Sequence, residues 1–206
     1  MRRSLAVRLP QLFLGLGLFG VGVWLCLQSH IGVAPWDVLA GGIAKQSGLS
    51  FGTVVILIGA VIVAATWLFG LRPGFGTIAN MILIGVVIDW LLATNWLDSE
   101  ANGHLVVRVA MVVAGVLCVG LASALYIGAH FGSGPRDSLM VVLHKRLHWS
   151  IARARTTVEL IALVLGVVLG GPAGAGTLIF ALGIGPAVQL AFAVLHQTPE
   201  KTTGEA

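Results

Sequence analysis

The sequence predicts an all-α polytopic membrane protein, with residues 1–206 forming a single membrane domain. Three observations predict this class: the composition, a series of long apolar stretches and an internal repeat. Apolar residues make up 57% of the chain and charged residues only 10%, whereas a soluble domain carries roughly 25% charged residues. This composition argues against a soluble enzyme, a nucleic-acid-binding domain and a disordered chain.

The long apolar stretches predict six transmembrane helices, because a bilayer-spanning helix needs about 20 predominantly apolar residues. The stretches are residues 9–28, 51–70, 76–95, 105–128, 152–170 and 176–195. Two shorter segments, 35–47 and 135–148, each begin with proline after a Gly-rich stretch, which is typical of a helix start. A helix of this length extends about 20 Å, short of a hydrocarbon core of about 30 Å. We therefore expect two half-helices that do not cross, and a polar tail at 198–206.

Residues 9–95 and 105–195 are predicted to be two copies of one repeat. The block His30-x-Gly32-x-x-Pro35-x-Asp37 recurs one hundred residues later as His130-x-Gly132-x-x-Pro135-x-Asp137, and Gly74-x-Gly76-Thr77 recurs as Gly174-x-Gly176-Thr177. Three spans per copy invert the second copy relative to the first, the 3+3 arrangement of many secondary transporters. Four spans per copy, with the short helices crossing, make the copies parallel. The distribution of Lys and Arg places both termini in the cytoplasm under either topology, so the shortness of the two segments decides for six spans.

Six ionisable residues in or beside these helices are candidates for substrate binding: His30, Asp37, His130, Asp137, Glu159 and Asp89. In an inverted pair the two Gly/Pro breaks approach each other near the membrane midplane, where a helix start offers free N–H groups. The structural alternative is that Asp37 and Asp137 cap their helices and that each histidine bonds loop backbone. Glu159 is an intramembrane acid, with the alternative of an i,i+4 ion pair to Arg155.

Other features have mainly structural interpretations. We expect the Gly74-x-Gly76 and Gly174-x-Gly176 blocks to form tight turns with positive φ. The basic run 144–149, with Arg153 and Arg155, is expected at the cytoplasmic lipid surface or as a docking site for a soluble protein. The sequence has no Ser/His/Asp, Cys/His or metal-ligand cluster, so we predict no enzyme activity, no cofactor and no metal.

Three motifs resemble the YczE-like branch of the YczE/YyaS/YitT family of bacterial integral membrane proteins. They are residues 32–39, residues 48–53 and Gly74-x-Gly76-Thr77-x-x-Asn80, and the resemblance covers about residues 10–195. It implies a multi-pass protein of the bacterial inner (plasma) membrane and brings no set of catalytic residues. The second copy departs from the motifs, since Trp36 becomes Arg136, Asn80 becomes Phe180 and Gly52-Thr53 becomes Ala152-Arg153. The two copies therefore cannot be equivalent as a site.

The leading functional hypothesis is a transporter or permease for a small solute in the lipid bilayer, with proton coupling through Glu159, Asp37, Asp137 or Asp89. The alternative is an accessory or regulatory membrane protein that scaffolds partner enzymes at the cytoplasmic face through the basic 144–155 surface. The sequence leaves a homo-oligomer and a cytoplasmic protein partner open, and it predicts no nucleic-acid partner.

Overall fold

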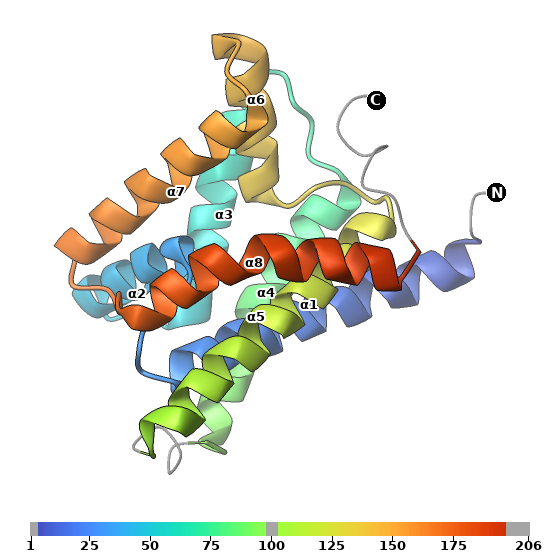
Figure 1. Ribbon diagram of the computed structural model, residues 1–206. Helices are drawn as coiled ribbons and strands as arrows, with labels where there is room; N and C mark the ends of the chain where they lie inside the picture. Colours follow the sequence, from blue (N-terminus) through green and yellow to red (C-terminus); the bar gives the residue numbers. More distant parts are fainter. Residues whose placement is uncertain (1–3, 98–102, 197–206) are drawn as a thin grey trace.

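Prolines, serines and glycines set the helix boundaries. The computed structural model describes residues 4–97 and 103–196, which contain eight α-helices and no strand (Figure 1). The helices are α1 (Leu5–Gln28), α2 (Pro35–Ser47), α3 (Phe51–Leu68), α4 (Phe75–Thr94), α5 (Leu105–Gly128), α6 (Pro135–Leu147), α7 (Ile151–Val168) and α8 (Ala175–Val194). Pro35 and Pro135 begin α2 and α6, while the hydroxyls of Ser50 and Ser150 cap α3 and α7. The all-α prediction is confirmed; the predicted tail at 198–206 lies outside the described residues.

The two breaks that precede α2 and α6 share one backbone conformation. His30 and His130 have φ values of 52° and 56°, and Gly32 and Gly132 both have φ of 122°. A side chain at Gly32 would also meet the backbone nitrogen of Gly174 at 2.7 Å. Glycine is therefore required at this position for both its conformation and the close approach of another segment.

The glycine blocks before α4 and α8 do not form the expected positive-φ turns. The left-handed residues of these connections are Gly70 and Gly170, with φ of 89° and 77°. Gly76 and Gly176 instead lie in the first turns of α4 and α8, where their amides donate to carbonyls of the opposite break: Gly76 to Phe131 at 2.8 Å and Gly176 to Ile31 at 2.7 Å. The blocks serve as docking points between segments, which explains their small residues.

Antiparallel helices α1 and α5 form the centre of the molecule, with α4 against α1 and α8 against α5 (Figure 1). Arg8, near the start of α1, donates to the carbonyls of Ala129 and His130, both at 2.8 Å, beyond the end of α5. Arg108, near the start of α5, donates in the same way to Ser29 at 2.6 Å and His30 at 2.7 Å. The main core lies between these helices and includes Leu12, Leu16, Val112 and Ile88, each with no exposed surface.

The remaining helices form a second layer in which α2 packs against α7 and α3 packs against α6. Helix α3 also packs closely on α4, whereas α7 makes little contact with α8. In Figure 1, α7 slants away from α8 and approaches it only at their connection. The seam between the two layers is therefore closed where α3 meets α4 and open between α7 and α8.

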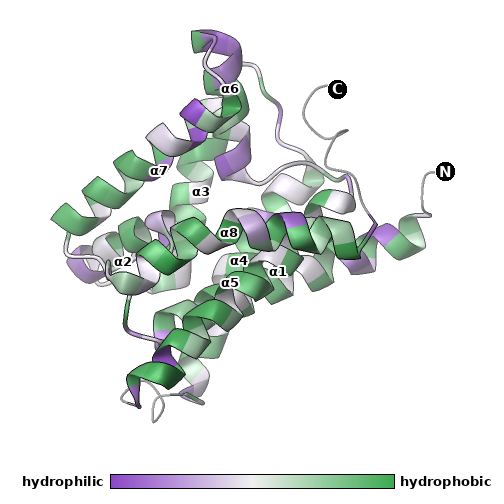
Figure 2. Cartoon of the chain, viewed as in Figure 1, coloured by the Kyte–Doolittle hydropathy of each residue, from purple (hydrophilic) through white to green (hydrophobic). Residues whose placement is uncertain are grey.

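Many large apolar residues are exposed, as expected for a protein in contact with lipid. Figure 2 shows hydrophobic residues along most of the helices. Within the described residues, five helices are long and apolar enough to cross a membrane: α1, α3, α4, α5 and α8. The sixth predicted stretch, 152–170, is helical as α7, but it carries Arg153, Arg155 and Glu159 and falls short of the others in apolarity. The chain is a membrane protein with several apolar helices.

Candidate functional site

The first turns of α2 and α6 meet in the interior, although the segments that lead into them come from opposite ends of α1. Arg108 binds the carbonyl of His30 at the end of α1, and Arg8 binds that of His130 at the beginning. The roughly 20 residues of helix between these ends extend about 30 Å. The five steps along the chain from His30 to Pro35, and from His130 to Pro135, reach at most about 17 Å. Helices α2 and α6 therefore start about midway along α1.

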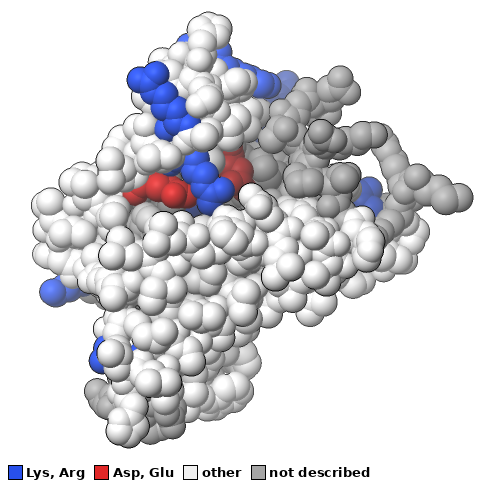
Figure 3. Space-filling model, viewed as in Figure 1, with Lys and Arg blue, Asp and Glu red and all other residues white. Residues whose placement is uncertain are grey.

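A cavity surrounds this meeting point, with about 180 Å³ open to the centres of water-sized molecules. Its charged lining residues are Asp37, Arg136, Asp137, Arg155 and Glu159. Figure 3 shows acidic side chains in a hollow between α7 and α8, with basic side chains next to them. The starts of both half-helices point their positive dipole ends into this region, which favours negative charge there.

Asp37 of α2 and Arg136 of α6 connect these two helices by an ion pair. The Asp37 side chain is 3% exposed, and its Oδ1 accepts a hydrogen bond from Nη2 of Arg136 at 3.1 Å. The guanidinium carbon of Arg136 also lies 5.4 Å from the centre of the Trp36 ring. Asp37 accepts no hydrogen bond from the described backbone, so it does not act as the helix cap that its first-turn position predicts.

Asp137 has different neighbours from Asp37. Its Oδ2 accepts a hydrogen bond from the hydroxyl of Tyr126 at 3.0 Å, and no Lys, Arg or His of the described chain pairs with it. Asn80 of α4 lines the same part of the cavity; it is 9% exposed and has no hydrogen-bond partner among the described residues. Two polar side chains with unused hydrogen-bonding capacity thus face the cavity.

Glu159 lies on α7 at the cavity and pairs with Arg155 at 2.9 Å, the i,i+4 ion pair that the sequence predicts. The Glu159 side chain is 29% exposed and that of Arg155 49% exposed. The structure confirms the ion pair and places Glu159 at the cavity, while its role in substrate binding stays a prediction. Arg155 is thus held by Glu159. Arg153 has a separate contact, because its guanidinium carbon lies 4.7 Å from the centre of the Trp149 ring.

Three of the six candidate residues lie outside the cavity. His30 and His130 are exposed, and their backbone carbonyls accept hydrogen bonds from arginines. Asp89 binds the first turn of α3 through Ser50 and Gly52. Asp37, Asp137 and Glu159 are the candidates that the fold brings together, and the described residues contain no group of three His, Cys, Asp or Glu side chains that could hold a metal.

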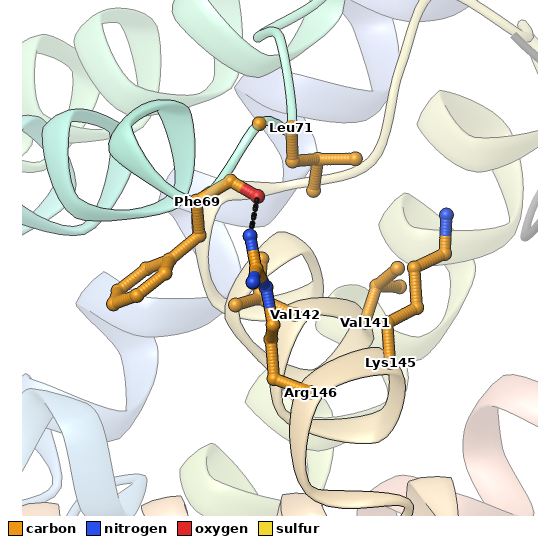
Figure 4. A pocket seen from close by; sticks show the side chains of 7 residues that line it. Phe69, Leu71, Val141, Val142, Lys145 and Arg146 are labelled. Carbon is orange, nitrogen blue, oxygen red and sulfur yellow. Dashed lines mark hydrogen bonds between the residues drawn. The ribbon is translucent and has the colours of Figure 1, made fainter.

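A second, smaller pocket of about 100 Å³ lies between α6 and the α3–α4 connection (Figure 4). Arg146 reaches across it to the carbonyl of Phe69 at 3.3 Å, while Lys145 extends to one side. One hundred residues earlier, Gln46 donates to the carbonyl of Leu169 at 3.1 Å. Each contact closes the end of a long helix, which gives Arg146 a structural role at this pocket.

Sequence reasoning missed Arg136, Tyr126 and Asn80 as cavity residues. The signal was present for Arg136 and Asn80, because both are positions at which the two predicted copies differ. In so apolar a chain, an arginine that replaces a tryptophan beside a predicted break marks a specific interaction. Tyr126 is the single tyrosine of the chain, and its repeat counterpart is Cys26.

Comparison with known proteins identifies the family. A profile described as a family of unknown function, DUF6198, matches residues 6–192. The chain belongs to the DUF6198 family. A protein of Haemophilus influenzae described as uncharacterized is 35% identical over 91% of this chain and 84% of its own length. From Bacillus subtilis, the uncharacterized membrane protein YczE is 34% identical over 88% of this chain and 84% of its own length, and the uncharacterized protein YyaS is 29% identical over 81% and 83%.

These relatives agree with the YczE-like resemblance of the sequence motifs. The DUF6198 match spans both half-helices and the cavity, from the first turn of α1 to the end of α8. No solved structure matches the chain, so the chemistry of the cavity rests on its own residues.

Proposed function

We propose that this protein is a transporter for a small solute, built as an inverted 3+3 repeat in the bacterial inner membrane with both termini in the cytoplasm. Six helices span the bilayer, α7 among them, and α2 and α6 enter it as half-helices. The solute binds in the cavity between their first turns, near Asp37, Asp137 and Glu159. Protons are the coupling ion, carried by these carboxylates.

The observation that carries this proposal is the meeting of Asp37 and Arg136 about midway along α1. Discontinuous helices that start near the midplane are a feature of secondary transporters, where they place backbone dipoles at the substrate site. Non-helical backbone at membrane depth is tolerated where it is buried in protein or lines a cavity. Both breaks satisfy this condition, because each docks on the glycine block of the other copy.

Contacts between positions one hundred residues apart support the inverted repeat. Arg8 and Arg108 make equivalent contacts, as do the Gly76 and Gly176 amides. A twofold axis that relates antiparallel α1 and α5 is perpendicular to both helices. When these helices cross a bilayer, such an axis lies in the membrane plane, which is the geometry of inverted repeats.

The difference between the α3–α4 seam and the α7–α8 seam supports a cavity that the solute reaches from one side of the membrane at a time. Under inversion, the closed α3–α4 seam and the open α7–α8 seam occupy equivalent positions in opposite halves of the membrane. The cavity residues Arg155 and Glu159 lie on α7, which borders the open seam. A transporter in an inward-open state has this combination of one closed and one open side.

Solute-dependent proton flux in proteoliposomes tests the proposal. A pH-sensitive dye inside the vesicles would report proton entry after addition of individual amino acids, organic amines or organic carboxylates. We expect at least one class to drive flux, and Glu159→Gln to abolish it without loss of folded protein. Gly17→Ala is the matched control, because a methyl group there meets no other atom within 4 Å. Absence of flux with every class, or full flux in the Glu159→Gln variant, contradicts the proposal.

The scaffolding alternative rests on a separate surface, the exposed basic side chains His144, Lys145, Arg146 and Arg153. It expects capture of cytoplasmic enzymes that is lost when Lys145, Arg146 and Arg153 are neutralised together. Such a variant leaves the cavity lining intact, so the flux measurement and the capture measurement separate the two functions.

A further inference from the structure

We propose that the surroundings of Asp137 form a binding site for the primary ammonium group of an organic amine. The binding site stands on geometry alone, and its role as the substrate site of a transporter rests on the function proposed above. The proposal identifies an amine as the solute class. It places the charged group of the amine at Asp137 and not at Asp37.

The charges that line the cavity leave Asp137 without a counter-ion. Arg136 pairs with Asp37 at 3.1 Å, and Arg155 pairs with Glu159 at 2.9 Å. Among the described residues, Asp137 pairs only with the neutral hydroxyl of Tyr126. It is partly exposed at the cavity, and an unpaired carboxylate there attracts a cation from solution.

Three oxygen atoms converge beside Gly134, where the absence of a side chain leaves them uncovered. A Cβ atom built on Gly134 would lie 3.4 Å from Asp137 Oδ2, 3.4 Å from the Tyr126 hydroxyl and 3.5 Å from Asn80 Oδ1. Asn80 is nine-tenths buried and has no hydrogen-bond partner in the described part of the chain. Its side chain lines the cavity, where a ligand can reach its amide oxygen, and this is the independent sign of a ligand.

The first copy has none of these features at the equivalent place. Ala34, Cys26 and Phe180 occupy the positions of Gly134, Tyr126 and Asn80. Asp37 already has its cation in Arg136, whereas the residue equivalent to Arg136 near Asp137 is Trp36. The duplicated framework thus holds one carboxylate neutralised by the protein and one carboxylate surrounded by free acceptors.

The number and kind of ligands favour an ammonium group over a metal ion. A primary ammonium has three N–H donors, which match the three oxygens around Gly134. Hard metal cations such as Ca²⁺ take about 6–8 oxygen ligands. The adjoining walls are apolar, with Phe19, Met81, Phe180 and Ile184, and such walls suit the carbon part of an amine.

Binding of n-hexylammonium to the purified protein tests this inference without any transport step. Isothermal titration calorimetry in detergent would compare n-hexylammonium with hexanoate at the same ionic strength. We expect saturable binding of the amine, none of hexanoate, and affinity reduced at least about tenfold by Asp137→Asn and by Gly134→Ala. The latter places a methyl group against all three oxygens at ordinary van der Waals distances and so covers them.

Gly134→Ala is expected to fold normally. Gly134 has φ of −61° and ψ of 161°, nearly the values of Ala34, which are −58° and 152°. Gly17→Ala again serves as the matched control and should bind the amine with unchanged affinity. If the unmodified protein and the Gly134→Ala and Gly17→Ala variants unfold at the same temperature, a loss of amine binding in Gly134→Ala is local.

Several outcomes would overturn the inference. These are no saturable amine binding to the folded protein, unchanged affinity in both variants, equal binding of hexanoate, or displacement of the amine by Na⁺ at equal concentration. Amine binding with no solute-dependent proton flux would refute the transporter and leave the ammonium site standing. Proton flux driven by a solute that has no amine group, together with no amine binding, would refute the ammonium site and leave the transporter standing.

Discussion

The carboxylate of Asp89, in the last turns of α4, lies 2.5 Å from the hydroxyl of Ser50 and so fastens α4 to the first turn of α3. The other carboxylate oxygen accepts the Gly52 amide at 2.6 Å. At the equivalent place between α7 and α8, Gln189 replaces Asp89 and is exposed, and Ala152 replaces Gly52. The closed and open seams therefore differ in sequence at the residues that would join them.

Removal of the Asp89 carboxylate should destabilise the α3–α4 seam. Asp89→Ala leaves the N–H group of Gly52 without its acceptor, and the loss of such a helix-terminal interaction costs about 1–2 kcal/mol. Thermal unfolding of the detergent-solubilised protein should show a lower midpoint. Gln189→Ala, its counterpart on α8, should leave the midpoint unchanged, and equal effects of the two substitutions would contradict this account.

Gly85 and Gly185 provide a matched test of the two seams. A Cβ atom on Gly85 would lie 2.5 Å from the carbonyl oxygen of Gly52 and 2.6 Å from Ile56, whereas one on Gly185 meets nothing within 4 Å. Gly85→Ala should cost about 1–3 kcal/mol through overpacking. Gly185→Ala should be neutral or slightly stabilising, because alanine favours the helix. Chemical denaturation measures both, and a similar cost at the two positions would show that α7 and α8 are also in close contact.

Separation of the Asp37–Arg136 pair should be costly from either side. Asp37→Ala leaves a guanidinium in the cavity without its counter-ion, and Arg136→Ala leaves a carboxylate that is 3% exposed. We expect each to lower the free energy of unfolding by about 3 kcal/mol, at the lower end for a buried pair because Arg136 is partly exposed. The double variant should lose less than the sum of the two, and a double-mutant cycle with no coupling would exclude a stabilising pair.

Cysteine labelling tests the six-span topology. In a Cys26→Ala, Cys118→Ala background, one cysteine is introduced by Arg72→Cys or by Gly103→Cys. With inverted repeats the α3–α4 connection is cytoplasmic and the α4–α5 connection is outside. A membrane-impermeant thiol reagent on intact cells should therefore label position 103 and spare position 72. The opposite pattern would mean parallel repeats with α2 and α6 spanning the bilayer.

The positions of the helices followed from local features of the sequence. Apolar length marked the long helices, Pro35 and Pro135 marked the starts of the short ones, and the spacing of Arg155 and Glu159 predicted their ion pair. These features act over one or two helical turns, so neighbouring residues contain the information. Local patterns gave a wrong prediction where a tertiary contact mattered. Gly74 and Gly76 were predicted to form a tight turn, but they form a docking point for the segment that contains Phe131.

Only the tertiary structure decided which side chains share the cavity. A helix can be recognised from its own sequence, but its rotation about its axis depends on the helices packed against it. Arg136 meets Asp37 across 99 residues of chain, and Asn80 reaches Gly134 from the other copy. His30 and His130 recur as faithfully as Asp37 and Asp137, yet the left-handed backbone at each histidine accompanies an exposed side chain. Sequence thus determined an all-helical membrane protein, and long-range packing brought Asp37, Asp137 and Glu159 to one cavity.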